Sequence, residues 1–363
     1  MNAADSQWMA QALRLAERGL YSTSPNPRVG CVLVKDGKLI GEGWHERAGE
    51  PHAEVHALRV AGNAARGATA YVTLEPCSHH GRTPPCAEAL VAAGVARVVT
   101  AMRDPNPLVA GAGIARLRAA GIEVECGLME AAAHELNVGF ISRMTRGIPW
   151  LRSKIAASLD GRTALSNGVS KWITGEAARR DVQHWRARSC AVLTGIGTVR
   201  ADDPRLDVRE ISTQRQPLRV VLDSALRISP KARILKDGQT LIYTSREQGD
   251  ELAALRAGGV EVATLAGADG KVDVSAVLRD LAQRGINEVL VEAGRTLNGA
   301  LLKAELMDEM VLYLAPQLLG DAARGLADLG ELTHLQQRVD LQWQDVRQVG
   351  DDLRIVARIT REE

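Results

Sequence analysis

The sequence predicts an α/β protein built from two fused domains. Short β-branched runs alternate with amphipathic stretches along most of the 363 residues, a pattern typical of largely parallel sheets covered by helices. The segment from Thr145 to Pro149, which contains a glycine and a proline, interrupts this alternation. We therefore expect one domain at residues 1–147 and a second at 148–363, two domains of ordinary size.

The first domain is expected to start with a helix over residues 6–20, capped by Ser6, because Met9, Leu13 and Leu20 recur at helical spacing. After this helix, the expected strands 30–34 and 39–41 are joined by an Asp36-Gly37 hairpin turn. The expected strands are 30–34, 39–41, 70–74, 96–101 and 122–126, and the further helices are 52–61, 86–93 and 113–120. This order predicts a largely parallel sheet over the first 145 residues.

The second domain repeats the alternation. Its expected strands are 151–156, 191–194, 218–223, 240–244, 288–292 and 310–314, with a closing strand at 353–359. Its expected helices are 176–187, 275–283 and 296–304.

Composition excludes several classes of protein. The chain has 45 basic and 44 acidic side chains and 3% aromatic residues, which argues against a nucleic-acid partner. No apolar run approaches the roughly 18 residues of a transmembrane helix, so no membrane partner is expected. The five cysteines are few for a chain of this length and odd in number, which argues against a disulfide framework. No signal peptide is visible. These features predict a cytoplasmic protein whose clustered cysteines bind metal or act in catalysis.

The most specific pattern is His52-Ala53-Glu54, followed by Pro76-Cys77 and then Cys86. One imidazole and two thiolates give three zinc ligands and leave a fourth position for water, as in catalytic zinc sites. Glu54 can carry the water's proton to a departing amine, and the pattern matches a zinc-deaminase signature. The competing interpretation is a structural zinc site, with His79 or His80 as the fourth ligand.

On these residues, the first half resembles the cytidine-deaminase superfamily. Eight residues separate Cys77 from Cys86. That longer loop and the segment 24–31 resemble the deaminase half of the bifunctional deaminase–reductases of riboflavin biosynthesis. The resemblance implies zinc on His52, Cys77 and Cys86 and a catalytic Glu54. It also implies substrate contacts from Asn26, His45, His79 and Arg82. From the residues alone, Asn26 between two prolines is equally a turn residue.

The second half lacks the usual dinucleotide fingerprint. The run from Gly195 to Val199 begins like G-x-G-x-x-G, but Arg200 stands at the third glycine position. The segment 291–300 reads as a strand, a glycine turn and a helix start, which can bind an anion. An ordinary glycine-rich connection explains the same residues.

Four segments (154–163, 170–175, 198–204 and 292–300) resemble the reductase half of the same family, whose fold is similar to that of dihydrofolate reductase. The resemblance implies a catalytic Lys154. It implies NADPH contacts from Ala156, Trp172, Thr198, Asp202, Ser224, Gly294, Arg295, Thr296, Leu297, Asn298, Gly299 and Ala300. It implies substrate contacts from Ser170, Arg186, Leu206, Arg209 and Glu292. Guanidinium groups suit a phosphorylated substrate, whereas a tryptophan such as Trp172 is more often a core residue.

The resemblance therefore implies two reactions in riboflavin biosynthesis. The first is zinc-dependent hydrolytic deamination of 2,5-diamino-6-(5-phosphoribosylamino)pyrimidin-4-one to 5-amino-6-(5-phosphoribosylamino)uracil. The second is NADPH-dependent reduction of the ribosyl group to ribityl. A small-molecule substrate and a homo-oligomer, a dimer or tetramer, are expected. The alternatives are a nucleic-acid-editing deaminase with an accessory domain and a non-catalytic zinc module. NADP rather than NAD rests on the resemblance alone.

Overall fold

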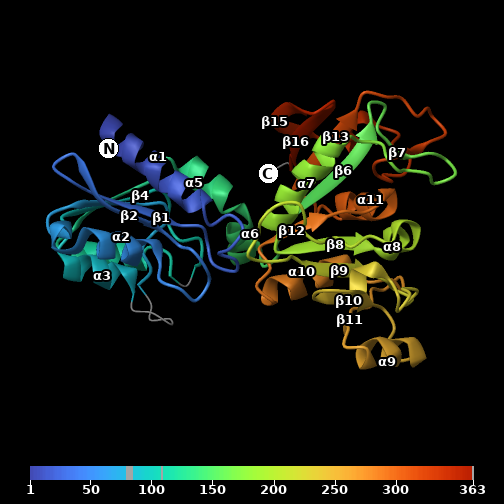
Figure 1. Cartoon of the computed structure of the whole chain (residues 1–363), viewed down its shortest axis with the longest axis horizontal. Helices are drawn as coiled ribbons and strands as arrows, with labels where there is room; N and C mark the ends of the chain where they lie inside the picture. The colour runs from blue at the N-terminus through green and yellow to red at the C-terminus, as the bar shows by residue number, and fades with distance from the viewer. Residues whose placement is uncertain (79–84, 108, 362–363) are drawn as a thin grey trace. The chain divides into compact units, whose positions relative to one another are not determined.

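The computed structural model describes residues 1–78, 85–107 and 109–361. Its chain divides into two compact units, Met1–Ile148 and Pro149–Glu363 (Figure 1). This division lies one residue beyond the boundary expected from the sequence.

Within the described residues, the first unit holds a five-stranded sheet in the order β2-β1-β3-β4-β5. Its strands are β1 (Gly30–Lys35), β2 (Lys38–Trp44), β3 (Thr69–Val72), β4 (Arg97–Thr100) and β5 (Glu123–Cys126). The last three are parallel, but β1 is antiparallel to both β2 and β3. The predicted hairpin of β1 and β2 is confirmed, whereas the prediction of a largely parallel sheet is wrong where β1 pairs with β3. The tight Asp36-Gly37 turn reverses the chain between β1 and β2. After α2 the chain returns on the other side of β1 as β3, which runs in the same direction as β2 and therefore opposite to β1.

Helices cover both faces of this sheet: α1 and α5 lie on one side, and α2 and α3 on the other (Figure 1). The helices of the unit are α1 (Ala3–Glu17), α2 (Ala53–Ala61), α3 (Cys86–Ala93), α4 (Ala112–Ala119), α5 (Glu130–Leu136) and α6 (Val138–Arg146), with a 3-10 turn at Gly62–Ala65. The first helix begins before the predicted Ser6, because Asn2 and Asp5 form a capping box there. The sequence analysis missed α5 and α6.

Two strand glycines let helices pack directly on the sheet backbone. A methyl group on Gly30 of β1 would lie 2.0 Å from the carbonyl oxygen of Ala12 in α1. A methyl group on Gly43 of β2 would lie 2.8 Å from the carbonyl oxygen of Ala53 in α2. The contact at Gly30 fixes α1 against the sheet, and the contact at Gly43 fixes the start of α2, because a side chain at either glycine would push the adjoining helix away.

In the described part of the second unit, nine strands form one sheet in the order β11-β10-β9-β8-β12-β6-β13-β16-β15. The strands are β6 (Trp150–Ser158), β8 (Ala191–Gly195), β9 (Leu218–Leu222), β10 (Thr240–Thr244), β11 (Glu261–Thr264), β12 (Glu288–Val291), β13 (Glu309–Ala315), β15 (Leu341–Val349) and β16 (Asp352–Ile359). The first seven strands in this order, from β11 through β6 to β13, are all parallel. The last two strands are antiparallel: β16 pairs with β13, and β15 pairs with β16 at the edge of the sheet. Short strands β7 (Arg162–Ala164) and β14 (Arg324–Gly325) form a separate pair.

The helices of the second unit are α7 (Glu176–Arg188), α8 (Ile196–Asp202), α9 (Asp250–Ala257), α10 (Val274–Gln283) and α11 (Arg295–Lys303), with 3-10 turns at Arg233–Leu235 and Leu335–Gln337. The sequence analysis missed α8, α9, β11 and β15. Strand β15 is largely exposed, so it lacks the buried apolar run that marks its neighbours.

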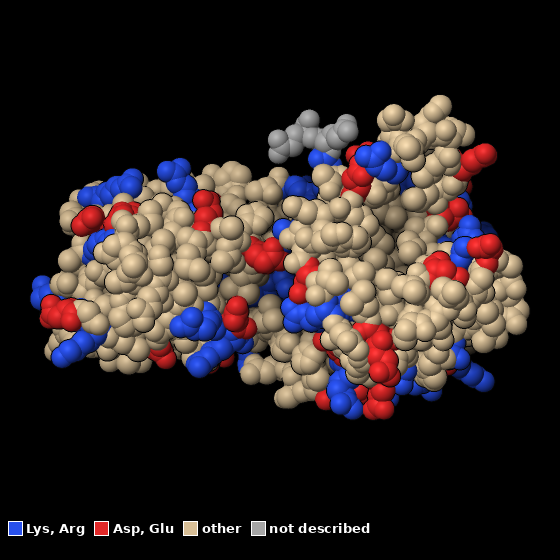
Figure 2. Space-filling view, turned by 90° about the horizontal axis from the view of Figure 1, so that it is seen from above, with Lys and Arg blue, Asp and Glu red and all other residues tan. Residues whose placement is uncertain are grey.

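The surface carries both signs of charge. On the face drawn in Figure 2, Lys and Arg side chains are interspersed with Asp and Glu side chains. Among the described residues, no helix has the length and apolar character needed to span a bilayer.

Replacing Gly30 tests the close packing of α1. We expect Gly30→Ala to lower the unfolding free energy of the first unit by about 3 kcal/mol, because the added methyl group clashes with helix backbone. Urea unfolding with hydrogen exchange over residues 1–148 measures this. Gly197→Ala is the control, since a methyl group there meets no atom within 4 Å. Equal stability of the two variants would contradict the packing argument.

Candidate functional site

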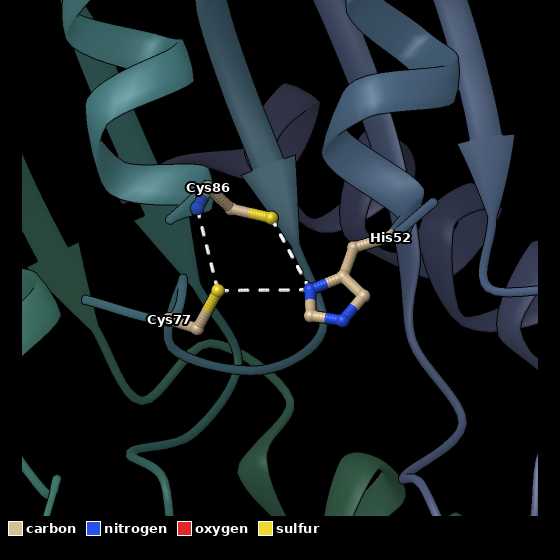
Figure 3. Close-up of side chains that lie close together, drawn as sticks. All are labelled: His52, Cys77 and Cys86. Carbon is tan, nitrogen blue, oxygen red and sulfur yellow. Dashed lines mark hydrogen bonds between the residues drawn. The ribbon is translucent and has the colours of Figure 1, made fainter. Parts of the chain in front are cut away.

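Three side chains from separate elements meet in the first unit (Figure 3). His52 directly precedes α2, Cys86 is the first residue of α3, and Cys77 follows β3. Their ligand atoms all lie within 4.8 Å of one another. His52 Nδ1 is 3.6 Å from Cys77 Sγ and 3.3 Å from Cys86 Sγ. One imidazole nitrogen and two sulfurs at this spacing suit a zinc ion.

The cluster favours thiolate at Cys77. Hydrogen bonds from Cys86 and His52 hold the pKa of Cys77 well below its usual range. The backbone N–H of Cys86, at the start of α3, also donates to Cys77 Sγ at 3.3 Å. A helix N-terminus stabilises negative charge, so the start of α3 adds to the stabilisation of the Cys77 thiolate.

Glu54 lies in the first turn of α2 and is 3% exposed. Burial raises the pKa of this carboxyl, and the negative charge of Cys77 raises it further. A buried carboxyl beside a metal cluster, with a pKa shifted towards neutrality, suits a group that accepts and returns one proton. Its position two residues after His52 matches the role that the resemblance implies.

The structure brings two further predicted residues to the same place. The His45 ring lies edge-on to the His52 ring, with centroids 5.2 Å apart. His45 Nδ1 is 3.1 Å from the Pro51 carbonyl oxygen, and Nε2 is 3.0 Å from Asn26 Nδ2. These partners assign the proton to Nδ1, since Nε2 must accept from the amide. Burial lowers the pKa of His45, in agreement with a neutral ring.

A cavity of about 630 Å³ opens beside the cluster, a size that fits a small molecule. His52, Glu54 and Cys77 line it, together with Asn26 and His45. Its walls also include side chains that the sequence analysis missed: Glu75, Asp104, Asn106, Phe140 and Arg143. Three of these follow β3 or β4 and two lie on the missed helix α6, so only their place in the fold identifies them. The predicted residues His79 and Arg82, and the alternative ligand His80, lie outside the described residues.

In the second unit, Lys154, Arg186 and Glu292 form a charged group. The register of β12 and β6 pairs Val291 with Ser153, so Glu292 and Lys154 are neighbours across the sheet. Arg186 of α7 binds both carboxylate oxygens of Glu292, at 2.5 Å and 3.0 Å. Burial opposes ionisation of Glu292, but the charge and hydrogen bonds of Arg186 outweigh it and lower the pKa. Burial lowers the pKa of Lys154; the charge of Glu292 opposes this shift, and the charge of Arg186 adds to it.

The residues expected to contact the nicotinamide cofactor gather at one edge of this sheet. Thr198 and Asp202 lie in α8 after β8, Ser224 follows β9, and Gly294 follows β12. Ala156 lies near the carboxyl end of β6. These four strands are neighbours and parallel, so their carboxyl ends form the edge where α/β proteins bind ligands.

Some of the expected cofactor contacts are used by the protein itself. Asn298 is 1% exposed, accepts a hydrogen bond from Ser153 Oγ at 3.0 Å and donates to the Leu326 carbonyl at 3.1 Å. A methyl group on Gly299 would lie 2.2 Å from the Asp328 carbonyl oxygen, so this residue packs against a loop. The exposed positions at this helix start are Gly294, Arg295, Thr296 and Ala300, with Leu297 partly buried.

Trp172 is 70% exposed, and the Arg179 guanidinium lies 4.5 Å from its ring centroid. The alternative that Trp172 is a core residue is therefore wrong. Among the predicted substrate contacts, Leu206 is buried at a φ of +53°, and Ser170 is partly buried. Arg209 is exposed and pairs with Asp207 at 2.8 Å.

Known proteins match both units. The profile of the cytidine and deoxycytidylate deaminase zinc-binding region matches residues 2–102, and the RibD C-terminal domain matches residues 149–355. The chain is 52% identical to riboflavin biosynthesis protein RibD of Escherichia coli (strain K12) over 362 residues, covering 96% of this chain and 98% of the relative.

Solved structures of RibD proteins are similar to this chain over nearly its whole length. Acinetobacter baumannii RibD superimposes with a TM-score of 0.91 at 51% identity, covering 99% of each chain. A Thermotoga maritima protein described as a diaminohydroxyphosphoribosylaminopyrimidine deaminase/5-amino-6-(5-phosphoribosylamino)uracil reductase gives a TM-score of 0.86 at 34% identity, covering 98% of this chain and 99% of that one.

The two units thus define a bifunctional enzyme, with a cytidine-deaminase-like domain followed by a reductase domain. The chain belongs to the RibD family of deaminase–reductases of riboflavin biosynthesis. The predicted family, α/β fold class and bifunctional activity are confirmed.

Removing a sulfur tests the metal site. We expect Cys86→Ala to lower the zinc content of the purified chain by at least about tenfold, because two ligands hold zinc much more weakly than three. Metal analysis after dialysis measures this. Cys126→Ala is the matched control, a cysteine of β5 outside the cluster. Equal zinc in both variants would show that the metal is bound elsewhere.

Proposed function

We propose that the first unit deaminates 2,5-diamino-6-(5-phosphoribosylamino)pyrimidin-4-one to 5-amino-6-(5-phosphoribosylamino)uracil. The second unit then reduces the ribosyl group to ribityl with NADPH. The observation that carries the proposal is the His52, Cys77 and Cys86 cluster, which opens into the cavity beside buried Glu54. The reactions named for the Thermotoga maritima relative, 34% identical over nearly the whole chain, support the choice of substrates.

In the deaminase unit, His52 Nδ1 and the sulfurs of Cys77 and Cys86 hold zinc. Bound zinc supplies an activated water for attack on the ring carbon that carries the amine. Glu54 takes a proton from that water and delivers it to the departing nitrogen, which leaves as ammonia. Asn26 and His45, fixed by their mutual hydrogen bond, orient the pyrimidine. His79 and Arg82 are assigned to the phosphoribosyl end of the substrate.

In the reductase unit, NADPH supplies hydride to the sugar carbon. The residues that would hold this cofactor are Ala156, Trp172, Thr198, Asp202, Ser224 and those from Gly294 to Ala300. Lys154 polarises the oxygen at the reduced carbon, and its lowered pKa suits a group that can give up a proton. Arg186 holds Glu292 towards Lys154, and Ser170, Leu206 and Arg209 complete the substrate contacts.

We also propose a cytoplasmic homo-oligomer, a dimer or tetramer. Thiolate ligands persist in a reducing compartment. For oligomerisation the support is the edge strand β15. Its register shifts after Trp343, which keeps Leu341, Trp343 and Val346 on one face of the sheet. Trp343 is 60% exposed and Val346 54%, and an exposed apolar edge strand favours pairing with another chain.

A coupled assay tests the two reactions. With zinc, the diaminopyrimidinone phosphoriboside and NADPH, we expect ammonia release followed by NADPH oxidation. Glu54→Ala should keep its zinc but lose ammonia release by about a hundredfold or more, because no other group moves the proton as well. Glu123→Gln, at an exposed side chain of β5, is the control and should behave as wild type. Ammonia release without NADPH oxidation would refute the reductase assignment. The absence of both ammonia release and NADPH oxidation would refute the proposed substrate.

The pH dependence of the reduction tests Lys154. A lysine is charged below its pKa, and burial lowers the pKa of Lys154 from 10.5. We therefore expect kcat/KM of the reductase to fall as the pH rises through a value below 10.5. Lys154→Arg keeps its charge at alkaline pH and should remove this fall while lowering the rate. An unchanged alkaline limb in the variant would assign the titration to another group.

A further inference from the structure

Glu75 is a buried carboxylate that the mechanism above leaves unused. It follows β3, lies two residues before Cys77 and is 4% exposed. An ionised carboxylate this deep in a protein needs strong hydrogen-bond donors, because burial removes its hydration. Within the described residues, its donors are backbone N–H groups from one stretch of chain that runs from the end of β4 into the first turn of α4.

The donors show what the carboxylate does. Its Oε2 atom accepts from the N–H of Asp104 at 3.2 Å and from the N–H of Gly111 at 2.9 Å. One oxygen therefore ties together both ends of the segment 104–107 and 109–111. Its Oε1 atom accepts from the N–H of Ile114 at 3.0 Å, in the first turn of α4. No side chain caps this helix at Gly111, so Glu75 satisfies the helix start instead.

The tied segment is a wall of the deaminase cavity. Asp104, Asn106 and Val109 line the cavity, as does Glu75 itself. Within the segment, Asp104 Oδ1 accepts from the N–H of Asn106 at 2.8 Å, which makes a compact turn. The wall therefore keeps its own shape, while Glu75 sets where it stands relative to Cys77.

A second contact holds the same region. A methyl group on Gly113 of α4 would lie 1.9 Å from the Pro76 carbonyl oxygen, one residue before Cys77. The start of α4 thus packs against the backbone that carries the metal ligand, and no larger residue fits there without moving one of them.

We propose that Glu75 is a positioning residue of the deaminase: it holds the cavity wall at 104–107 and 109–111 at a set distance from the metal-ligand cluster, and so determines substrate affinity. This inference rests on the deaminase reaction proposed above. It assigns Glu75 no contact with the reacting atoms.

Glu75→Gln is the direct test, because the amide keeps the length of the side chain but turns one acceptor into a donor facing an N–H group. We expect KM for the diaminopyrimidinone to rise about tenfold or more, the equivalent of one lost charged hydrogen bond, with kcat changed far less. Zinc content and NADPH-dependent reduction of the aminouracil should stay as in wild type. Glu123→Gln, whose side chain is 69% exposed on β5, is the matched control.

Gly113→Ala is the second variant, since it keeps the Glu75 carboxyl group but places a methyl group 1.9 Å from the Pro76 carbonyl oxygen and 3.2 Å from Glu75 Oε1, which displaces the same wall. We expect the same rise in KM with zinc retained, which decides the matter if Glu75→Gln does not fold. An unchanged KM in both variants would overturn the proposal. So would loss of zinc and kcat at unchanged KM, which would make Glu75 a support of the ligand cluster. A wild-type chain without deaminase activity would overturn the proposed function, and this inference with it.

Discussion

The direct contact between helix backbone and strand backbone in the first unit decides where its chemistry lies. Gly43 on β2 meets the Ala53 carbonyl of α2, and a side chain at that glycine would lift the helix off the sheet. His52 and Glu54 sit at the start of that helix, so their distance from Cys77, which follows β3, depends on this packing. Metal coordination tolerates errors of only a few tenths of an ångström, which a loosely packed helix could not guarantee.

In the second unit, the site's side chains are positioned by strand register and by a charged hydrogen-bonded pair. Lys154 and Glu292 are neighbours because β6 and β12 run parallel in one register. Both groups are withdrawn from water, which costs free energy unless each charge is matched. Arg186 provides the match through two hydrogen bonds to Glu292. The result is a site whose polar groups are oriented before any ligand arrives.

Both units also use a buried polar side chain to anchor a neighbouring segment. In the first unit Glu75 collects backbone N–H groups from the cavity wall and from α4. In the second unit Asn298 bridges Ser153 of β6 and the Leu326 carbonyl, and so holds α11 against the sheet. Glu75 contacts no substrate in the proposed mechanism but fixes the cavity wall, and Asn298 fixes the helix start that is assigned to the cofactor. Substituting them disturbs a site indirectly, through the position of the backbone.

The sequence by itself determined the two-domain α/β organisation, and it singled out His52, Cys77 and Cys86, which the structure brings together, with Glu54 beside them. Buried strands leave apolar runs, and ligand residues must be of particular types at restricted spacings, so both are visible in one dimension. It did not determine the antiparallel pairing of β1 with β3, the helices α5 and α6, or the exposed strand β15, because those depend on which surfaces are covered in the folded chain. Nor could it assign Glu75, Phe140 or Arg143 to the cavity. Only the tertiary structure decided these, because residues distant in the chain become neighbours when helices and strands pack.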